Sequence, residues 1–131
     1  MVIDNSAIVA TVAGEPDGHR FQAAMLGAAS LSVSAVTVLE TRIVLFSRQG
    51  ADAVREFDDM LEGVGIDVVP FDTEMAEVAF KAFRRYGKGQ GHPAQLNIID
   101  CAAYALAQVR GEKLLFKGGD FGKTDIEPAL S

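Results

Sequence analysis

Apolar positions along the chain follow two different spacings. Short apolar runs are typical of buried strands, whereas apolar residues that recur every three or four positions are typical of helices with one buried face. In residues 51–61, for example, Val54, Phe57 and Met60 share one helical face and acidic residues occupy the other. Apolar runs predict strands at residues 2–4, 31–34, 67–71 and 113–116. Helical spacing predicts helices at residues 6–12, 16–29, 36–48, 51–61, 73–86 and 98–109.

Glycine and proline residues separate these predicted elements. Gly14 and Pro16 lie between the first two helices, and Gly50 follows the third. Residues 87–95, which read GKGQGHPAQ, must form a loop. Because helices intervene between successive strands, the connections cross over and favour a parallel sheet with helices on both faces. We therefore predict a single α/β domain over residues 1–131, with three layers (α/β/α) around a central, mostly parallel sheet.

Composition narrows the class of protein further. Hydrophobic residues make up 49% of the chain, which is enough for a core without disulfides. No segment approaches the roughly 20 apolar residues of a membrane helix, and no basic segment followed by an apolar one marks a secretory signal. Cys101 is the single cysteine and cannot form an internal disulfide. We expect a protein of the cytoplasm that is not attached to a membrane.

Charge is distributed unevenly along the chain. The net charge of −6 argues against general electrostatic attachment to nucleic acid. Residues 1–80 carry 13 acids and 4 bases (−9), whereas residues 81–131 carry 8 bases and 5 acids (+3). The basic side chains form either an ordinary solvated surface or a local rim that binds anions, and the sequence leaves both interpretations open. Arg84, Arg85 and Lys88 form a cluster in this region, and Lys113, Lys117 and Lys123 follow.

Acidic residues stand where predicted strands end. Asp4 closes the first strand, and both Asp120 and Asp125 follow the last one. In open parallel sheets, ligands bind outside the carboxyl ends of the strands. Each of these residues also has a purely structural explanation, because aspartate commonly caps helices and stabilises turns.

Two further acids lie within predicted helices that are otherwise apolar. Glu40 is in the middle of VTVLETRIVLF, where Leu39, Leu45 and Phe46 predict a helix that is buried around much of its circumference. A buried carboxylate needs a cationic partner, which would be either a metal ion or an arginine from another element. Asp100 has apolar neighbours in LNIIDCAAYALAQ, although it could also cap the start of its own helix.

These acids are expected to converge at one end of the sheet. Gathered carboxylates repel each other and resist ionisation unless a cation neutralises them, and Mg²⁺ and Mn²⁺ prefer oxygen ligands. His19 and His92 do not have the spacing of a zinc site, and no P-loop motif is present. The sequence therefore predicts a site for a divalent metal ion, with the ligands Asp4, Glu40, Asp100 and Asp120, and Asp125 as an additional or substitute ligand.

The same segments resemble the PIN-domain nucleases, and more closely the VapC-type toxins of bacterial type II toxin–antitoxin pairs. MVIDNSAIVA, SAVTVLE, LNIIDCAAYALA and LLFKGGDFGKTDI carry the similarity, in the order of the family and over essentially the whole chain. The family's four acids match Asp4, Glu40, Asp100 and Asp120, and Ser6 matches a position that is commonly Ser or Thr. The loop GKGQGHPAQLN is one residue longer than the related pattern GKGRHPAALN and lacks its arginine, so no loop contact with substrate is transferred.

The resemblance implies a PIN-like α/β/α fold and an endoribonuclease that depends on Mg²⁺ or Mn²⁺. It implies that the four acids hold the metal, that cleavage leaves a 5′-phosphate and a 3′-hydroxyl, and that Ser6 contacts a phosphate or a metal-bound water. An RNA substrate, a homodimer and a cognate VapB-like antitoxin, which inserts an arginine-bearing segment into the acidic site, are also implied. The side chains expected to contact flanking phosphates are Arg84, Arg85, Lys88, Lys117 and Lys123.

The main alternative is a non-catalytic acidic module of receiver-like type that binds a metal ion or a protein. Lys117 after the last strand fits a receiver, but receivers carry a pair of acids after their first strand, and here Asn5 and Ser6 follow Asp4. A phosphatase of the DxD type would need an acid where Ser6 stands. A nuclease-like domain that only binds proteins is a third alternative, against which the presence of all four acids argues.

Overall fold

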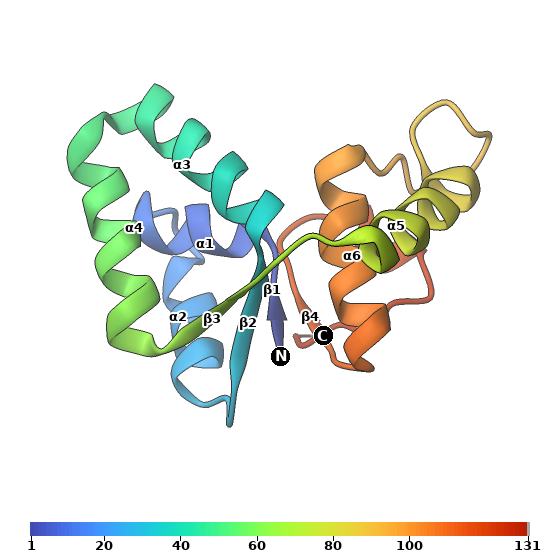
Figure 1. The fold of residues 1–131 in the computed structure, drawn as a ribbon. Helices are drawn as coiled ribbons and strands as arrows, with labels where there is room; N and C mark the ends of the chain where they lie inside the picture. The colour runs from blue at the N-terminus through green and yellow to red at the C-terminus, as the bar shows by residue number, and fades with distance from the viewer. Residues whose placement is uncertain (131) are drawn as a thin grey trace.

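Residues 1–130 of the protein are described by a computed structural model (Figure 1). A four-stranded parallel sheet in the order β3-β2-β1-β4 lies at its centre. The strands are β1 (Val2–Ile3), β2 (Leu31–Ser34), β3 (Ile66–Val69) and β4 (Leu114–Leu115). The helices are α1 (Asn5–Val12), α2 (Gly18–Leu26), α3 (Ala35–Gln49), α4 (Ala51–Val64), α5 (Thr73–Tyr86), α6 (Ile98–Arg110) and the 3-10 helix η1 (Phe121–Lys123). Within this part of the chain no helix has both the length and the apolar character needed to cross a membrane.

Helices cover both faces of the sheet, because neighbouring residues of a strand point in opposite directions. Ile3 and Leu115 are completely buried in one core, which they share with α1 to α4. Val2 and Leu114 are completely buried in the other core, with α5 and α6. Figure 1 shows these two groups of helices on opposite sides of the strands. The prediction of a three-layer α/β/α fold around a parallel sheet is therefore confirmed.

The observed elements follow the predicted ones, with boundaries shifted by a few residues. The strand predicted at residues 67–71 runs instead from Ile66 to Val69. It ends there because Pro70 has no N–H to donate to a neighbouring strand. Helix α2 begins at Gly18, later than predicted. Nothing in the sequence pattern predicted η1, which is too short to show a helical period.

The predicted burial of the third helix was wrong. Leu39 and Phe46 of α3 are 60% and 63% exposed, and only Leu45 of the three apolar residues is buried. The core-facing side of α3 contains Thr37 and Thr41 instead. The hydroxyl of Thr41 donates to the carbonyl oxygen of Thr37 at 2.7 Å, so this polar residue enters the core without an unmade hydrogen bond.

Candidate active site

Asp4 lies at the carboxyl end of β1 and is the N-cap of α1. Its backbone N–H donates to the carbonyl oxygen of Leu115 at 2.9 Å, which fixes it beside β4. The side chain is buried, and its Oδ2 atom accepts hydrogen bonds from Ser6 N (3.0 Å) and Ser6 Oγ (2.6 Å). The Oδ1 atom has no hydrogen-bond partner. Burial raises the pKa of this carboxyl group, while the bonds from Ser6 oppose the rise.

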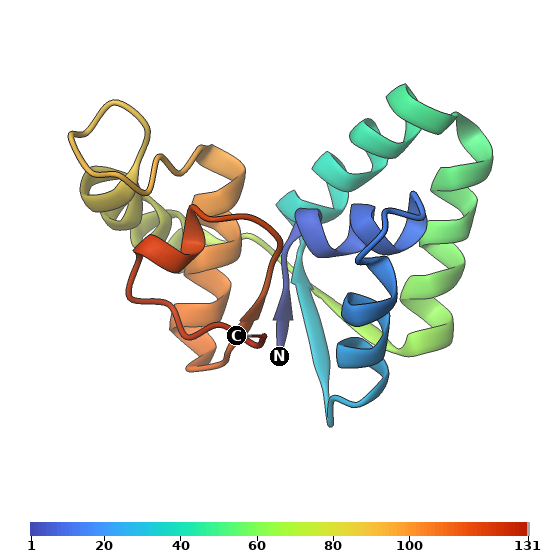
Figure 2. The same cartoon turned by 180° about the vertical axis from the view of Figure 1, so that it is seen from behind.

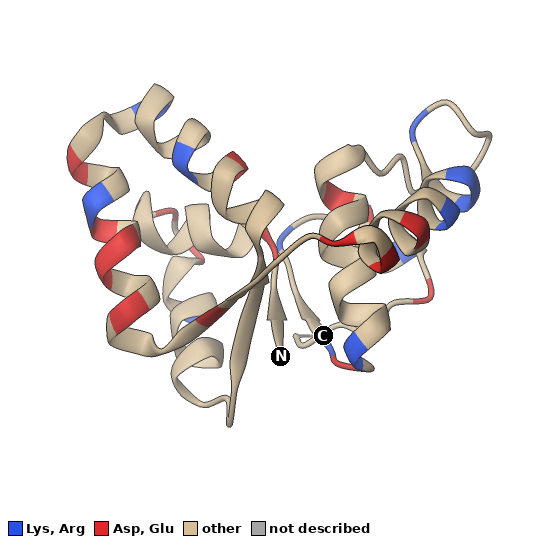
Figure 3. Cartoon of the chain, viewed as in Figure 1, with Lys and Arg blue, Asp and Glu red and all other residues tan. Residues whose placement is uncertain are grey.

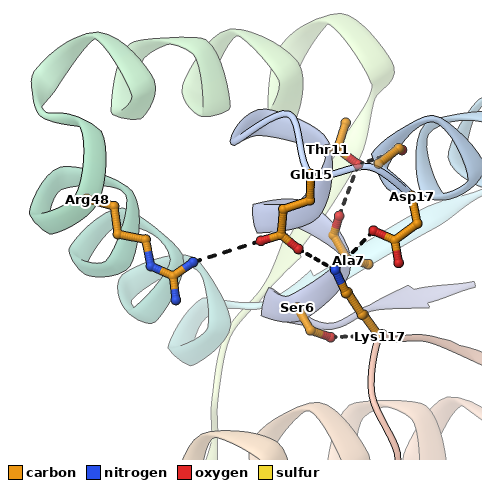
Figure 4. Close-up of polar contacts among 8 residues, drawn as sticks. Ser6, Ala7, Thr11, Glu15, Asp17, Arg48 and Lys117 are labelled. Carbon is orange, nitrogen blue, oxygen red and sulfur yellow. Dashed lines mark hydrogen bonds and ion pairs between the residues drawn. The ribbon is translucent and has the colours of Figure 1, made fainter.

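Ser6 connects Asp4 to the chain segment that follows β4. While Ser6 Oγ donates to Asp4, it accepts a hydrogen bond from the backbone N–H of Lys117 at 2.9 Å (Figure 4). The ammonium of Lys117 points away from this contact and bonds to Glu15 at 2.6 Å and Asp17 at 3.0 Å. Lys117, expected to contact phosphate, is thus paired within the protein, and sequence reasoning did not identify its two acidic partners.

Asp100 lies in the first turn of α6, where it forms a capping box with Asn97. Its Oδ2 atom accepts from the backbone N–H of Asn97 at 3.0 Å. Burial raises the pKa of Asp100 to about 6, and the negative charges of Asp4, Asp120 and Glu40 contribute to the rise. Asp4, Asp120 and Glu40 therefore each lie within electrostatic reach of Asp100.

Glu40 and Asp120 complete this acidic group from two other elements. Glu40 projects from α3 and is half-buried, and Asp120 lies exposed in the turn that precedes η1. Within residues 1–130 neither side-chain carboxylate has a hydrogen bond or an ion pair, so the arginine partner considered for Glu40 is not found there. The carboxylates of Glu40 and Asp120 are thus uncompensated, and those of Asp4 and Asp100 have raised pKa values. Together the four acids create a site of concentrated negative potential.

The chemistry of this site suits a hard divalent cation. Its donors are all carboxylate oxygens, and the buried Oδ1 atom of Asp4 is left without a partner. In the described part of the chain, no three His, Cys, Asp or Glu side chains are already arranged to hold a metal ion. Within residues 1–130 no protein group holds the carboxylates of Glu40 and Asp120, so both side chains are free to rotate.

Asp125, the other predicted ligand, is engaged elsewhere. Its Oδ1 atom accepts a hydrogen bond from the hydroxyl of Tyr104 at 2.5 Å, and its Oδ2 atom is 3.7 Å from Arg85. Figure 2 shows the segment around η1 lying across α6, which carries Tyr104. Asp125 therefore fastens this segment to α6, whereas Asp120 is the acid of this segment whose charge contributes to the raised pKa of Asp100.

Basic residues cluster at the end of α5 and in the loop that follows it (Figure 3). Arg85 pairs with Asp125 and stacks on the ring of Tyr86 at 4.7 Å. Arg84 and Lys88 have no salt bridge among the described residues. A hollow of about 240 Å³ is lined by Lys81, Arg84 and Arg85. Sequence reasoning missed Lys81, although its helical spacing from the two arginines indicates that it shares their face.

A larger hollow of about 500 Å³ lies between α5 and α6, and its lining includes Ile99 and Cys101, the chain neighbours of Asp100. Its lining is almost entirely apolar and includes Phe80 and Ile98, which are 63% and 77% exposed. Exposed apolar surface of this kind is typical of a protein–protein contact.

Comparison with known proteins places this fold and site in a family. The PIN domain family matches residues 1–127, and the chain therefore belongs to the PIN-domain family. Ribonuclease VapC42 of Mycobacterium tuberculosis is 43% identical over 131 residues, with 100% of both chains covered. This similarity confirms the resemblance to the VapC group that the sequence motifs indicated, in place of a receiver or a DxD phosphatase.

Solved structures share the fold at much lower identity. The crystal structure of Mycobacterium tuberculosis VapC20, described as a sarcin–ricin loop cleaving toxin, superposes with a TM-score of 0.80 at 17% identity and covers 95% of each chain. A toxin–antitoxin complex from Klebsiella pneumoniae gives a TM-score of 0.67 at 16% identity and covers 92% of this chain and 88% of the other. The α/β/α architecture is therefore that of known VapC toxins.

Proposed function

We propose that the protein is an endoribonuclease that requires a divalent metal ion and acts in the cytoplasm as the toxin of a type II toxin–antitoxin pair. The observation that carries this proposal is the buried Oδ1 atom of Asp4, which has no partner among the described residues, beside Asp100, whose pKa the charges of Asp4, Glu40 and Asp120 raise. RNA as the substrate class is supported by the full-length relatives that are named VapC ribonucleases.

In this proposal Asp4, Glu40, Asp100 and Asp120 hold Mg²⁺ or Mn²⁺, and Asp125 is left out because both of its oxygens are engaged. Such an ion, when bound, polarises a phosphate oxygen and lowers the pKa of a coordinated water. Ser6 keeps Oδ2 of Asp4 occupied, so that Oδ1 is the oxygen presented to the ion.

Hydrolysis of the phosphodiester bond then needs a proton acceptor and a fixed direction of attack. One of these four carboxylates, holding the ion through a water and not directly, would accept a proton from the attacking water. The water oxygen bonds to phosphorus, the bond to the 3′-oxygen breaks, and that oxygen takes up a proton. The products are a 5′-phosphate and a 3′-hydroxyl.

RNA flanking the cut is held by the basic surface at the end of α5. Arg84 and Lys88 are free of salt bridges within residues 1–130, and Lys81 and Arg85 extend the same surface. Contacts of this kind fix the backbone without reading sequence. Recognition of a particular RNA therefore depends on bases in a single-stranded region.

Two protein partners belong to the proposal. A cognate VapB-like antitoxin is supported by the fold shared with the toxin–antitoxin complex from Klebsiella pneumoniae. A homodimer is supported by the apolar hollow between α5 and α6, because a second copy would remove Phe80 and Ile98 from water.

Cleavage by the purified protein, free of antitoxin, tests this function. We expect it to cut structured RNA when Mg²⁺ or Mn²⁺ is supplied and to stop when EDTA is added. Asp4→Asn and Asp100→Asn should each lower the rate by about 100-fold or more, the scale of losing one electrostatic stabiliser in an active site. Asp59→Asn, a change at an exposed acid of α4, is the control and should leave the rate unchanged. Full activity in EDTA, or in Asp4→Asn, would contradict the proposal.

A further inference from the structure

Lys117 uses its backbone and its side chain for two different connections. The backbone N–H donates to Ser6 Oγ at 2.9 Å. The ammonium bonds to Glu15 at 2.6 Å and to Asp17 at 3.0 Å, both in the segment between α1 and α2 (Figure 4). One residue thus joins the exit of β4 to both ends of α1.

The backbone connection reaches the acidic site. Ser6 Oγ, which accepts from Lys117, donates to Oδ2 of Asp4 at 2.6 Å. Oδ2 is thereby filled, and Oδ1 is the buried atom that lacks a partner. The direction in which Asp4 presents its free oxygen therefore depends on where the backbone of Lys117 lies.

The chain after Lys117 does little to fix that position. Gly118, which follows directly, has a φ of +102°, and Gly119 comes next. Glycine has the widest backbone freedom of any residue, so this stretch does not restrain its neighbour. The two ion pairs of the Lys117 ammonium add a restraint to that of β4, which ends two residues earlier at Leu115. Glu15 is held in turn near Arg48 of α3, at 3.9 Å, so the anchor is itself connected to the helix that carries Glu40.

We propose that Lys117 is a positioning residue for the ribonuclease reaction and not a contact to phosphate. Its ammonium, held by Glu15 and Asp17, keeps its own backbone N–H on Ser6 and so keeps Asp4 oriented toward the other acids. This inference rests on the proposed function and deepens it. It replaces the expectation from the sequence that Lys117 binds a flanking phosphate.

Kinetics of two variants separate the two roles of Lys117. Lys117→Met removes the charge of residue 117 and retains its backbone N–H. The double variant Glu15→Gln, Asp17→Asn retains the Lys117 ammonium but removes the two negative charges that pair with it. For a positioning residue, both variants should lower kcat by roughly 10-fold, as the loss of an outer-shell partner does, with KM and its salt dependence unchanged. Lys117→Arg, which can keep both ion pairs, should restore most of kcat.

A phosphate contact gives the opposite pattern and would overturn the inference. In that case Lys117→Met raises KM and weakens its salt dependence, while the double variant, with its lysine freed, leaves kcat unchanged. Lys113→Met is the matched control, because Lys113 pairs with Glu127 at 3.6 Å and has no link to Ser6. This control should behave as the wild type does.

Amide hydrogen exchange tests the same connection without activity. The backbone N–H of Lys117 should exchange faster in Lys117→Met and in the double variant, and at the wild-type rate in Lys113→Met. Unchanged exchange at residue 117 in both test variants would overturn the inference. If the wild-type protein cuts no RNA, the proposed function is wrong. Amide hydrogen exchange at residue 117 would then still show whether the Lys117 side chain holds its own backbone in place.

Discussion

In the proposed site, Asp4 divides its two carboxylate oxygens between a structural task and a chemical one. Oδ2 caps α1 through Ser6, and Oδ1 is left free in a buried position. Asp100 does the same in α6, where its Oδ2 atom closes the capping box with Asn97. Helix capping and membership of the site are therefore not competing explanations for these residues. A cap holds the carboxylate in place, and a fixed carboxylate is what a metal site needs.

At the scale of a single residue, we predict that the metal-free protein is stabilised by Asp100→Asn at neutral pH. Burial and neighbouring acids raise the pKa of Asp100 from 3.8 to about 6. The folded state therefore binds a proton more readily than the unfolded state, and stability is lost as pH rises through the folded pKa. The neutral asparagine avoids this loss. Urea unfolding in EDTA at about pH 8 should show a higher midpoint for the variant, and the gain should shrink toward about pH 4.

The matched control for this measurement is Asp59→Asn. Asp59 is exposed on α4 and has no salt bridge within the described residues. Its substitution should leave the dependence of stability on pH unchanged. A gain for Asp100→Asn that is equal at both pH values would show that the carboxyl group does not resist ionisation.

At the scale of secondary-structure elements, close packing between α1 and α2 depends on Gly18. A Cβ atom at this position would lie well inside van der Waals contact with the carbonyl oxygen of Ala10, which is backbone and cannot rotate away. We predict that Gly18→Ala lowers the free energy of unfolding by about 1–3 kcal/mol, the usual cost of overpacking. Thermal and urea unfolding would measure it.

Gly63→Ala provides the opposite case within a helix. Gly63 lies in α4, and nothing is within 4 Å of the position that a Cβ would occupy. Alanine is favoured over glycine inside helices by up to about 1 kcal/mol, so this variant should be more stable than the wild type. Equal effects of the two substitutions would mean that helix propensity, and not the contact with Ala10, decides the stability of Gly18→Ala.

At the scale of the whole molecule, the charge asymmetry predicts how RNA binds. The first 80 residues carry a net charge of −9 and the remainder +3, so RNA should meet the protein at the end of α5. We predict that Arg84→Ala combined with Lys88→Ala weakens RNA binding. The slope of the logarithm of the binding constant against the logarithm of the salt concentration should also become flatter, by about 0.7 for each lost contact with single-stranded RNA. Filter binding at several salt concentrations, in EDTA to prevent cleavage, measures both quantities.

Arg55→Ala is the control for this prediction. Arg55 is exposed on α4, pairs with Asp52 and belongs to the acidic part of the molecule. Its substitution should not change the salt slope. An unchanged slope in the double variant would assign Arg84 and Lys88 to the surface without a role in binding RNA.

The sequence by itself determined the elements and where the acids lie along them. Apolar spacing is a local property, so it predicted the strands and helices within a few residues, and intervening helices required a parallel sheet. Strand ends and helix starts then placed Asp4, Asp100 and Asp120 at one edge of that sheet. Local spacing failed for α3, because Thr37 and Thr41 take core positions that the apolar pattern assigned to other residues, and of the two only Thr41 has a partner for its hydroxyl among the described residues.

Only the tertiary structure decided which side chains pair with one another and which are left without a partner. Lys117 and Ser6 are 111 residues apart in the sequence, and Lys117 and Glu15 are 102 apart, yet both pairs are in hydrogen-bond contact. The structure likewise assigned Asp125 to Tyr104 and left Oδ1 of Asp4 without a partner. Hydrogen bonds and ion pairs are specified by distances of a few ångströms between groups that only folding brings together, and no local pattern in a sequence encodes those distances.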